Sequence, residues 1–463
     1  MSVASTDARA AHTDGVQRLL SSYRAIPAGS AIRLAKPTSN LFRARAKNTG
    51  PGLDTSGLTG VIAVDPDART ADVAGMCTYE DLVAATLPYG LSPLVVPQLK
   101  TITLGGAVTG LGIESASFRN GLPHESVLEM DVITGTGEIV RTAPDENADL
   151  FRSFPNSYGT LGYSVRLKID LELVKPFVEL RHLRFDSVPD LIEAMGKIIE
   201  TGGLDGDRVD YLDGVVFSAS EGYLCVGIQS ATPGPVSDYT GSEIYYRSIQ
   251  HENGEKHDRL TIHDYLWRWD TDWFWCSRAF GAQNPRIRRW WPRRYRRSSF
   301  YWKLINFDQK FHIADRLEMR SVRPPGRSPQ ERVVQDVEVP IERTAEFLQW
   351  FLDNVPIEPI WLCPLRLRDE ESWPLYPLRP RHSYVNVGFW SSVPAGPEEG
   401  HTNRMIERKV SELDGHKSLY SDAYYSPEDF DELYGGEIYQ TVKKTYDPDS
   451  RLLDLYAKAV QQR

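Results

Sequence analysis

Residues 95–121, VVPQLKTITLGGAVTGLGIESASFRNG, contain the residue pattern most suggestive of chemistry. Gly105, Gly106, Gly110 and Gly112 fall within eight positions. A glycine has no Cβ, so backbone N–H groups beside it can approach a ligand, and successive N–H groups form an anion-binding concavity. The segment has neither a P-loop motif nor GxGxxG between a strand and a helix. We therefore expect a pyrophosphate here, the alternative being a tight turn of closely packed small residues.

Two further loops carry hydrogen-bond donors. Residues 36–43, KPTSNLFR, place two hydroxyl side chains and one amide after a short predicted strand. Residues 156–165, NSYGTLGYSV, form a second glycine loop that leads into a strand. Three donor-rich loops in one domain suit a long anionic cofactor that lies across all of them.

A different segment, residues 286–297, holds seven arginines and no acidic residue in a chain of net charge −10. Arginine pairs with lipid phosphates, and the interspersed tryptophan and tyrosine favour the headgroup level of a membrane. We therefore expect a docking surface for an anionic membrane. The alternative is a solvated arginine face over buried tryptophans. Nucleic-acid binding is not expected, because a nucleic-acid-binding domain is normally basic as a whole.

The composition limits the remaining classes. The four cysteines are scattered without a CxxC pair, so neither a zinc site nor a disulfide framework is indicated, and no metal is expected. The N-terminus lacks a signal-peptide pattern. No apolar run approaches the length of about 20 residues that spans a bilayer. We expect a cytoplasmic protein whose membrane contact is peripheral, on the inner face of the membrane.

The elements that must position these loops form a predicted α+β domain over residues 19–175, after a polar tail over 1–18. Thr78, with Asp81 three residues later, predicts the start of a helix. Alternating apolar and polar residues and turn signals predict strands. These strands fall within 58–75, 126–142 and 163–173.

Residues 176–390 contain a weak internal repeat. A strand, a helix and two further strands over 178–230 recur in the same order over 333–390. Two β-α-β-β units predict one antiparallel sheet with helices on one face, so the fold class is α+β throughout. The insert between the units, 231–332, holds seven of the eleven tryptophans. A helical C-terminal segment is predicted over 391–463.

The first 175 residues resemble the FAD domain of the vanillyl-alcohol-oxidase/PCMH flavoproteins. TLGGAVTGLGIES is similar to that family's pyrophosphate loop, and SYGTLGYSVRLKI to its later glycine loop and strand. GIESAS, DENADLF, YGTLGY, PIWLCP, LYSDAYY and GGEIY resemble stretches of the Δ24-sterol reductases in the same order. The likeness departs at the N-terminus, where the eukaryotic enzymes carry a membrane helix. A chain rich in Arg, Ala and Asp looks more like bacterial relatives that reduce 10-methylene fatty acyl chains on the route to 10-methylstearic (tuberculostearic) acid.

The resemblance implies a PCMH-type FAD domain, a cap domain over the substrate side of the flavin, and a C-terminal segment that returns to the FAD domain. The implied FAD-binding residues are Thr38, Ser39, Asn40, Thr101, Thr103, Leu104, Gly105, Gly106, Gly110, Gly112, Ile113, Glu114, Ser115, Ser117, Gly159, Thr160, Gly162 and Lys444. Relatives that bind FAD covalently use a His or Cys in these loops. Residues 37–43 and 103–112 contain neither, so we expect non-covalent FAD, with NADPH or NADH as a transient electron donor.

Reducing an isolated alkene requires a well-placed acid, because protonation of one carbon leaves a tertiary cation that a hydride can quench. Glu114 is one candidate, since burial in its loop would raise its pKa; its alternative role is to accept N–H bonds that hold the loop. Asp422, Tyr424 and Tyr425 are the others, because the resemblance returns LYSDAYY to the flavin, with core packing as their alternative. His124 is expected to be an ordinary surface or loop residue.

The leading hypothesis is an FAD-dependent, NAD(P)H-consuming reductase that converts phospholipid-borne 10-methylene acyl chains to 10-methyl chains. The alternatives are a Δ24-sterol-type reductase, an FAD oxidase of an alcohol or sugar, and a non-catalytic lipid-binding protein. The expected partners are the lipid substrate and an anionic membrane surface contacted through Arg286–Arg297. The methyltransferase that makes the methylene lipid is a further candidate partner.

Overall fold

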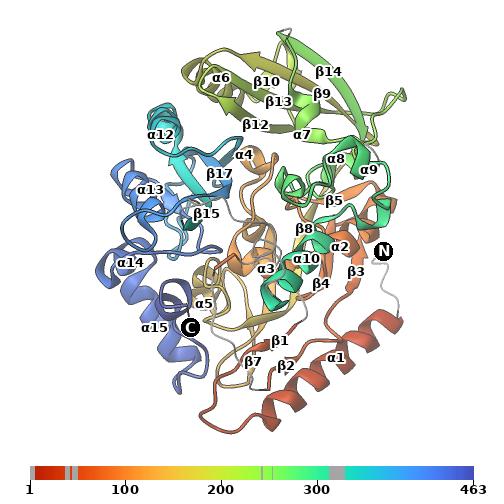
Figure 1. Cartoon of the computed structure of the whole chain (residues 1–463). Coiled ribbons are helices and arrows are strands. Elements are labelled where there is room, and N and C mark those ends of the chain that lie inside the picture. Colours follow the sequence, from red (N-terminus) through yellow and green to blue (C-terminus); the bar gives the residue numbers. More distant parts are fainter. Residues whose placement is uncertain are drawn as a thin grey trace.

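The computed structural model describes residues 6–36, 42–43, 51–240, 243–252, 254–311 and 329–462. Two sheets organise these residues: a smaller one from the first part of the chain and a larger one from the middle (Figure 1). The α+β class expected from the sequence is confirmed, since helices and antiparallel strands contribute to both parts.

The smaller sheet contains the strands predicted around the glycine loops. Its order is β3-β4-β8-β6-β7, with β5 paired to β8, and its pairings are antiparallel. The strands are β3 (Val61–Asp65), β4 (Thr70–Ala74), β5 (Leu91–Pro93), β6 (Val127–Ile133), β7 (Ile139–Thr142) and β8 (Tyr163–Leu173). Thr78 caps α2 (Tyr79–Thr86) as predicted, its hydroxyl accepting a 3.2 Å bond from the backbone N–H of Asp81.

Short elements complete this part of the chain. They are the parallel pair β1 (Leu34–Ala35) and β2 (Leu53–Asp54), the helices α3 (Leu104–Gly110), α4 (Ser117–Asn120) and α5 (Ala148–Ser153), and the 3-10 turns η1 (Leu87–Tyr89) and η2 (Pro123–Ser126). Helix α3 is built from the glycine loop itself. The loop residues are therefore held by a cap and by neighbouring strands.

The polar tail predicted over residues 1–18 is wrong for its described part, because helix α1 (Thr6–Ala25) occupies it. Leu19 is buried in a small cluster, and Val16, Leu20 and Tyr23 pack against the same cluster. These four residues follow the i, i+3, i+4, i+7 spacing of one helix face, so they form a narrow apolar stripe on an otherwise polar helix. The stripe is covered by β2 and β3.

The larger sheet confirms the two predicted β-α-β-β units. Its strand order is β14-β9-β13-β12-β16-β17-β15-β18. The first unit is β9 (Phe177–Phe185), α6 (Val188–Thr201), β12 (Tyr211–Ser218) and β13 (Glu221–Ser230), and the second is β15 (Gln330–Pro340), α12 (Ile341–Asn354), β16 (Ile360–Arg366) and β17 (Ser383–Pro394). The units meet at β12 and β16, so β9-β13-β12 mirrors β15-β17-β16. A hairpin of β10 (Gly203–Leu204) and β11 (Asp207–Arg208) follows α6.

The two faces of this sheet are covered differently. One face carries Leu362, Val387 and Val337, which form a core with α6, α12 and α13 (His401–Glu412). The opposite face carries Trp361, Cys363 and other residues that join the core of the smaller sheet and the tryptophan-rich insert. Side chains alternate along each strand, so the same strands supply both faces.

The insert packs its first tryptophans inward. Trp267, Trp269, Trp273 and Trp275 are buried, and Phe274 stacks on both Trp269 and Trp390 with ring centroids 4.9 and 4.5 Å apart. The insert elements are α7 (Tyr245–Ile249), β14 (Glu255–Thr261), α8 (Ile262–Leu266), η3 (Cys276–Phe280), α9 (Pro285–Arg288), η4 (Arg293–Tyr295) and α10 (Ser298–Phe311). The buried-tryptophan alternative therefore holds for the first half of the insert.

The C-terminal part contacts both preceding parts. Its elements after α13 are β18 (His416–Lys417), α14 (Pro427–Leu433), α15 (Gly436–Tyr446) and α16 (Leu455–Ala459). Helix α15 lies against α5, while β18 pairs with β15 (Figure 1). None of the helices in the described residues combines the length and apolar character that crossing a membrane requires.

Candidate active site

The glycines of the first loop, residues 95–121, have two roles: some allow close packing against the sheet, and others leave the backbone accessible. A Cβ on Gly105 would lie 2.6 Å from the carbonyl oxygen of Gly75, so this glycine permits close contact between α3 and the sheet. Gly106, Gly110 and Gly112 are instead partly exposed. Their accessible backbone is the part of the loop that a ligand can reach.

The second glycine loop lies directly against the first. Thr109 accepts two bonds from it: its carbonyl from the N–H of Tyr158 at 2.9 Å, and its hydroxyl from the N–H of Gly159 at 3.1 Å. Leu111, Asn156 and Tyr158 have φ values of 60°, 61° and 50°. Left-handed non-glycine residues each cost on the order of 1–3 kcal/mol and cluster where function requires a particular loop shape.

The third loop also reaches this place. Thr38, Ser39 and Asn40 lie outside the described residues, but Phe42 and Arg43 follow them closely. The Arg43 guanidinium donates to the carbonyl of Leu419 at 2.6 Å and lies 4.9 Å from the centre of the Tyr158 ring. The N–H of Phe42 donates to the carbonyl of Tyr420 at 2.8 Å. The ends of all three loops therefore converge on Tyr158 and the segment at 419–420.

These loops fit a bound FAD. A side chain at Gly110 would press on the Tyr158 ring, with its Cβ 3.1 Å from the nearest ring atom, so the two loops can stay close only with glycine there. The accessible backbone at Gly106 and Gly110 can hold a pyrophosphate, and Arg43 brings positive charge to the same side. In the described residues no cluster of three His, Cys, Asp or Glu side chains could hold a metal ion.

Several predicted binding residues instead hold the loop itself. The Thr103 hydroxyl caps α3 by accepting from the Gly106 N–H at 3.2 Å. The Ser117 hydroxyl accepts from the Glu114 N–H at 3.1 Å, and the Thr160 hydroxyl donates to the Ser157 carbonyl at 2.8 Å. Besides Glu114, the buried residues of the predicted binding set are Thr103, Leu104, Gly105, Ile113, Ser115, Ser117, Gly159, Thr160 and Gly162. Thr101 is partly exposed. Their direct contact with FAD stays a prediction.

Glu114 lies in a buried charge cluster that the sequence analysis did not foresee. Arg268, fully buried in the insert, places its Nη2 atom 3.1 Å from Glu114 Oε1 and 2.9 Å from Asp213 Oδ2. The indole N–H groups of Trp269 and Trp361 also donate to Asp213 Oδ2, at 3.3 and 3.2 Å. Two carboxyl groups thus share one guanidinium inside an aromatic wall.

The local backbone explains this placement. The N–H of Leu212 on β12 donates to the carbonyl of Ser115 at 2.8 Å, so the end of the glycine loop is bonded to the sheet one residue before Asp213. The Ser115 hydroxyl contacts both the Glu114 carboxylate and, at 2.9 Å, the hydroxyl of Tyr265 in α8. Loop, sheet and insert therefore fix Glu114 together.

The electrostatics of the cluster favour a protonated Glu114. Burial raises the pKa of Glu114 above its usual value; the Arg268 guanidinium opposes this rise and the Asp213 carboxylate adds to it. The Oε1 atom of Glu114 accepts no hydrogen bond from any residue that the structure describes. Burial therefore shifts this carboxyl toward its protonated form, and its role as a proton donor stays a prediction. The alternative role, acceptance of an N–H bond that holds the loop, is also present, since the Ser115 N–H contacts Oε2.

A second pair of acids lies on the same face of the sheet. Burial raises the pKa of Asp336 to about 6, and burial together with Asp336 raises the pKa of Glu338 well above its usual value. The Tyr376 hydroxyl donates to Glu338. Asp336 accepts from the Asn386 amide at 3.1 Å and forms a side-chain hydrogen bond with Tyr420.

The described contacts of the catalytic candidates in LYSDAYY are with segments other than the glycine loops, and their catalytic role stays a prediction. Asp422 forms an ion pair with Arg332 at 2.6 Å, and the Tyr424 ring packs over Arg404. Tyr425 is buried against Tyr434, with ring centroids 5.8 Å apart. The alternative of core packing describes Tyr425, and the residue of this segment that meets the loops is Tyr420.

The predicted Lys444 also lies away from the loops, exposed on α15. Its neighbour Lys443 points inward, donating to the carbonyl of Thr160 at 2.8 Å and to Asp447 at 2.6 Å. A helix turns by about 100° per residue, so adjacent lysines face different surroundings. Lys443 therefore carries the anchoring role near the second glycine loop.

His124 is buried in η2 and not a surface residue. Its ring lies 4.5 Å from that of Trp373, and burial lowers its pKa to about 3. It is therefore neutral at physiological pH and cannot supply a proton as an imidazolium.

The residues missed by sequence reasoning were Arg268, Asp213 and Tyr420. Arg268 stands between two tryptophans in LWRWD, and a charge in an otherwise apolar aromatic run is a usable signal of a buried ion pair. Tyr420 is the first tyrosine of the segment that was singled out. No local pattern marks Asp213, which lies within a strand.

Comparison with known proteins agrees with this geometry. Residues 9–143 match the family model described as FAD binding domain. The Delta(24)-sterol reductase of Mus musculus is 26% identical over 415 residues, which cover 87% of this chain and 76% of the relative. The Delta(24)-sterol reductase of Arabidopsis thaliana is 24% identical over 454 residues, covering 89% and 77%. Cytokinin dehydrogenase 5 of Arabidopsis thaliana is 28% identical over 201 residues, covering 40% and 37%. The chain is an FAD-dependent oxidoreductase with a PCMH-type FAD-binding domain.

Proposed function

We propose that this oxidoreductase reduces an isolated carbon–carbon double bond of a lipid, with NADPH or NADH as the electron donor. The observation that carries the proposal is the buried Glu114 carboxyl beside Arg268, at the end of the glycine loop and within an aromatic wall. Relatives named as Delta(24)-sterol reductases support a double bond as the reacting group.

In the proposed reaction Glu114 donates its proton to one alkene carbon. The accessible backbone at Gly106 and Gly110, with Arg43 on the same side, would hold FAD non-covalently, and that group, once reduced by a nicotinamide, would supply the hydride chemistry for the other carbon. The Glu114 carboxylate is then stabilised by the Arg268 guanidinium 3.1 Å away until it regains a proton from water. The indoles around Asp213 exclude water from this place.

The substrate we favour is a 10-methylene fatty acyl chain carried by a phospholipid. Its support is an arginine-rich surface on the same insert that supplies Arg268, described below, which suits a phosphate-bearing lipid. A Δ24-sterol-type side chain is the second candidate, favoured by the names of the similar proteins. Both alkenes give a tertiary cation on protonation, so one site chemistry serves either.

The proposal is tested by following flavin colour without oxygen. Purified holoprotein is bleached anaerobically with NADPH and then mixed with a 10-methylene phospholipid or with desmosterol. We expect the phospholipid to restore the yellow colour in a single turnover and to yield the 10-methyl product. Return of colour with desmosterol alone would assign the sterol reaction. If neither lipid reoxidises the flavin and air does so at once, the protein is an oxidase and the proposal is wrong.

A further inference from the structure

The arginine-rich segment 286–297 divides into inward and outward side chains. Arg288 is buried and pairs with Asp272 at 2.6 Å, and Arg297 pairs with Glu80 at 2.5 Å. The Arg296 guanidinium donates to the carbonyl of Arg288 at 2.6 Å. Contacts within the protein therefore hold these three arginines in place.

The outward set forms an exposed tip around Trp290. Trp290 is 82% exposed and Ile287 is 43% exposed, although both are large apolar side chains. The exposed arginines beside them are Arg286, Arg289, Arg293 and Arg294. Two exposed apolar side chains with four exposed arginines close by in the sequence match the composition of a membrane interface contact.

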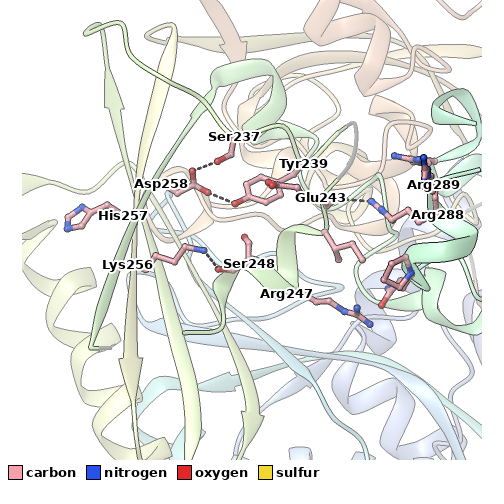
Figure 2. Close-up of a pocket in the computed structure, with 14 residues that line it drawn as sticks. Ser237, Tyr239, Glu243, Arg247, Ser248, Lys256, His257, Asp258, Arg288 and Arg289 are labelled. Carbon is pink, nitrogen blue, oxygen red and sulfur yellow. Dashed lines mark hydrogen bonds between the residues drawn. The ribbon is translucent and has the colours of Figure 1, made fainter. Parts of the chain in front are cut away.

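A pocket of about 770 Å³ lies directly beside this tip, between β14, α7 and α9 (Figure 2). Arg247 from α7 and Arg289, one residue beyond α9, both line it. Arg289 therefore belongs to the pocket and to the exposed tip at once. The volume is within the range of about 300–1,000 Å³ that small-molecule sites occupy.

The pocket has more basic than acidic side chains. Its lining includes Arg247, Lys256, Arg288, Arg289 and Arg296, against Glu243 and Asp258.

One of the two acids in this lining, Asp258, is already occupied by hydroxyl donors. Asp258 accepts from the hydroxyls of Ser237 and Tyr239 at 2.6 and 2.5 Å, and Glu243 bonds Arg288 through its backbone carbonyl (Figure 2).

Two arginines of the pocket carry unneutralised charge. Neither Arg247 nor Arg289 has a carboxylate partner in the part of the chain that the structure describes. Burial and the nearby Arg288 and Arg293 cations lower the pKa of Arg296, as expected where like charges crowd together. An anion in the pocket would relieve this crowding. Guanidinium groups bind phosphate oxygens in a bidentate manner.

We propose that this pocket binds the phosphodiester headgroup of an anionic lipid at a membrane surface, while Ile287 and Trp290 enter the headgroup layer. The proposal rests on the proposed function and deepens it, because it assigns the place where the lipid is recognised. The same insert carries Tyr265 and Arg268 to Glu114. Docking at the tip thus places the bilayer beside the segment that walls the reactive carboxyl.

The test is flotation of the holoprotein with vesicles of equal parts phosphatidylglycerol and phosphatidylcholine, compared with phosphatidylcholine alone. We expect binding to the anionic vesicles only, weakening as salt is raised. The double variant Arg247→Gln/Arg289→Gln should bind about 25-fold more weakly, since one basic residue near an anionic leaflet contributes about fivefold. Trp290→Ser should weaken binding separately. The matched control Arg208→Gln/Arg381→Gln removes two exposed charges elsewhere and should leave binding unchanged.

Two further measurements are needed. One distinguishes a lipid headgroup from free phosphate as the ligand, and the other distinguishes the docking site from the proposed reaction. Inorganic phosphate at constant ionic strength should fail to displace the vesicles; protein that binds inorganic phosphate but no vesicle would overturn a lipid as the ligand. Wild-type vesicle binding by the Arg247→Gln/Arg289→Gln variant would overturn the pocket as the site. Detergent-dispersed substrate should still reoxidise the flavin of the wild-type protein without any vesicle, so a failed reaction and a failed docking surface give different results.

Discussion

The two faces of the eight-stranded sheet differ in chemistry, although their residues alternate along the same strands. Leu362 and Val387 face α6, α12 and α13 and belong to a purely apolar core. Cys363 and Asn386, next to them in sequence and paired in register, face the other way, with Glu338 beyond them. One face is therefore mainly apolar, and the opposite face combines an aromatic core with ionisable groups whose burial costs stability. The comparison teaches that buried acids are tolerated on the face of this sheet where polar and aromatic side chains can bond them.

The largest expected effect comes from Glu114→Gln, which tests whether the face that carries buried acids supplies the proton. The variant keeps the shape of the side chain and removes its proton, so kcat should fall by about 100-fold to 10,000-fold. Flavin content and the rate of anaerobic bleaching by NADPH should be unchanged. The control is Glu125→Gln, a buried carboxyl whose role is to accept the N–H groups of Leu122 and Arg368. Wild-type turnover by Glu114→Gln would exclude this residue as the acid.

A pair of adjacent substitutions compares the two faces directly. Leu362→Ala leaves a cavity in the apolar core and should lower the free energy of unfolding by about 2–5 kcal/mol. Cys363→Ala removes much less buried volume, so we expect about 1 kcal/mol. Urea unfolding of both holoproteins measures the difference. Equal losses would contradict the larger loss expected from the cavity at Leu362.

The third prediction concerns the pH dependence of the reactive face. Asp336 has a pKa of about 6 in the folded protein, against about 3.9 when unfolded. Because the folded state holds the proton more tightly, the stability contributed by Asp336 is greatest below pH 4, falls between pH 4 and 6, and stays lower above pH 6. Asp336→Asn removes this penalty and should be more stable than the wild type at pH 8 by at most about 3 kcal/mol.

Unfolding free energies at pH 4 and pH 8 check this prediction. The two proteins should be similar at pH 4, where the carboxyl is protonated. The exposed Asp186→Asn serves as the control and should show no pH-dependent gain. A variant of Asp336 that is less stable than the wild type at pH 8 would contradict the sign.

The smallest expected effect comes from Tyr420→Phe. The phenol accepts from the Trp390 indole at 2.9 Å and lowers the pKa of Asp336 through its hydrogen bond. Its loss should cost about 1 kcal/mol and move the fall in stability to higher pH. A pH series of unfolding free energies measures this displacement, and an unchanged midpoint would show that Tyr420 does not act on Asp336.

Much of the fold could be predicted because its signals are local. The patterns of β9, β12, β13 and β15 to β17 and the periods of α6 and α12 lie within single segments, and the order of those segments defined the two units. Helix α1 was missed because its apolar stripe is narrow, and a mostly polar segment becomes helical only when a partner covers Leu19. The glycine loops were found because glycine spacing is itself the signal.

The sequence alone predicted the α+β class and the glycine loops, because each depends on residue types at fixed short spacing, and the resemblance added Glu114 as an acid candidate. Only the tertiary structure decided which charges meet. Arg268 is separated from Glu114 and Asp213 by long stretches of chain, and no local pattern reports a distance of 3.1 Å between them. The same reason explains Lys443 in place of Lys444 and Tyr420 in place of Tyr425: the direction in which a side chain points is set by packing against distant segments.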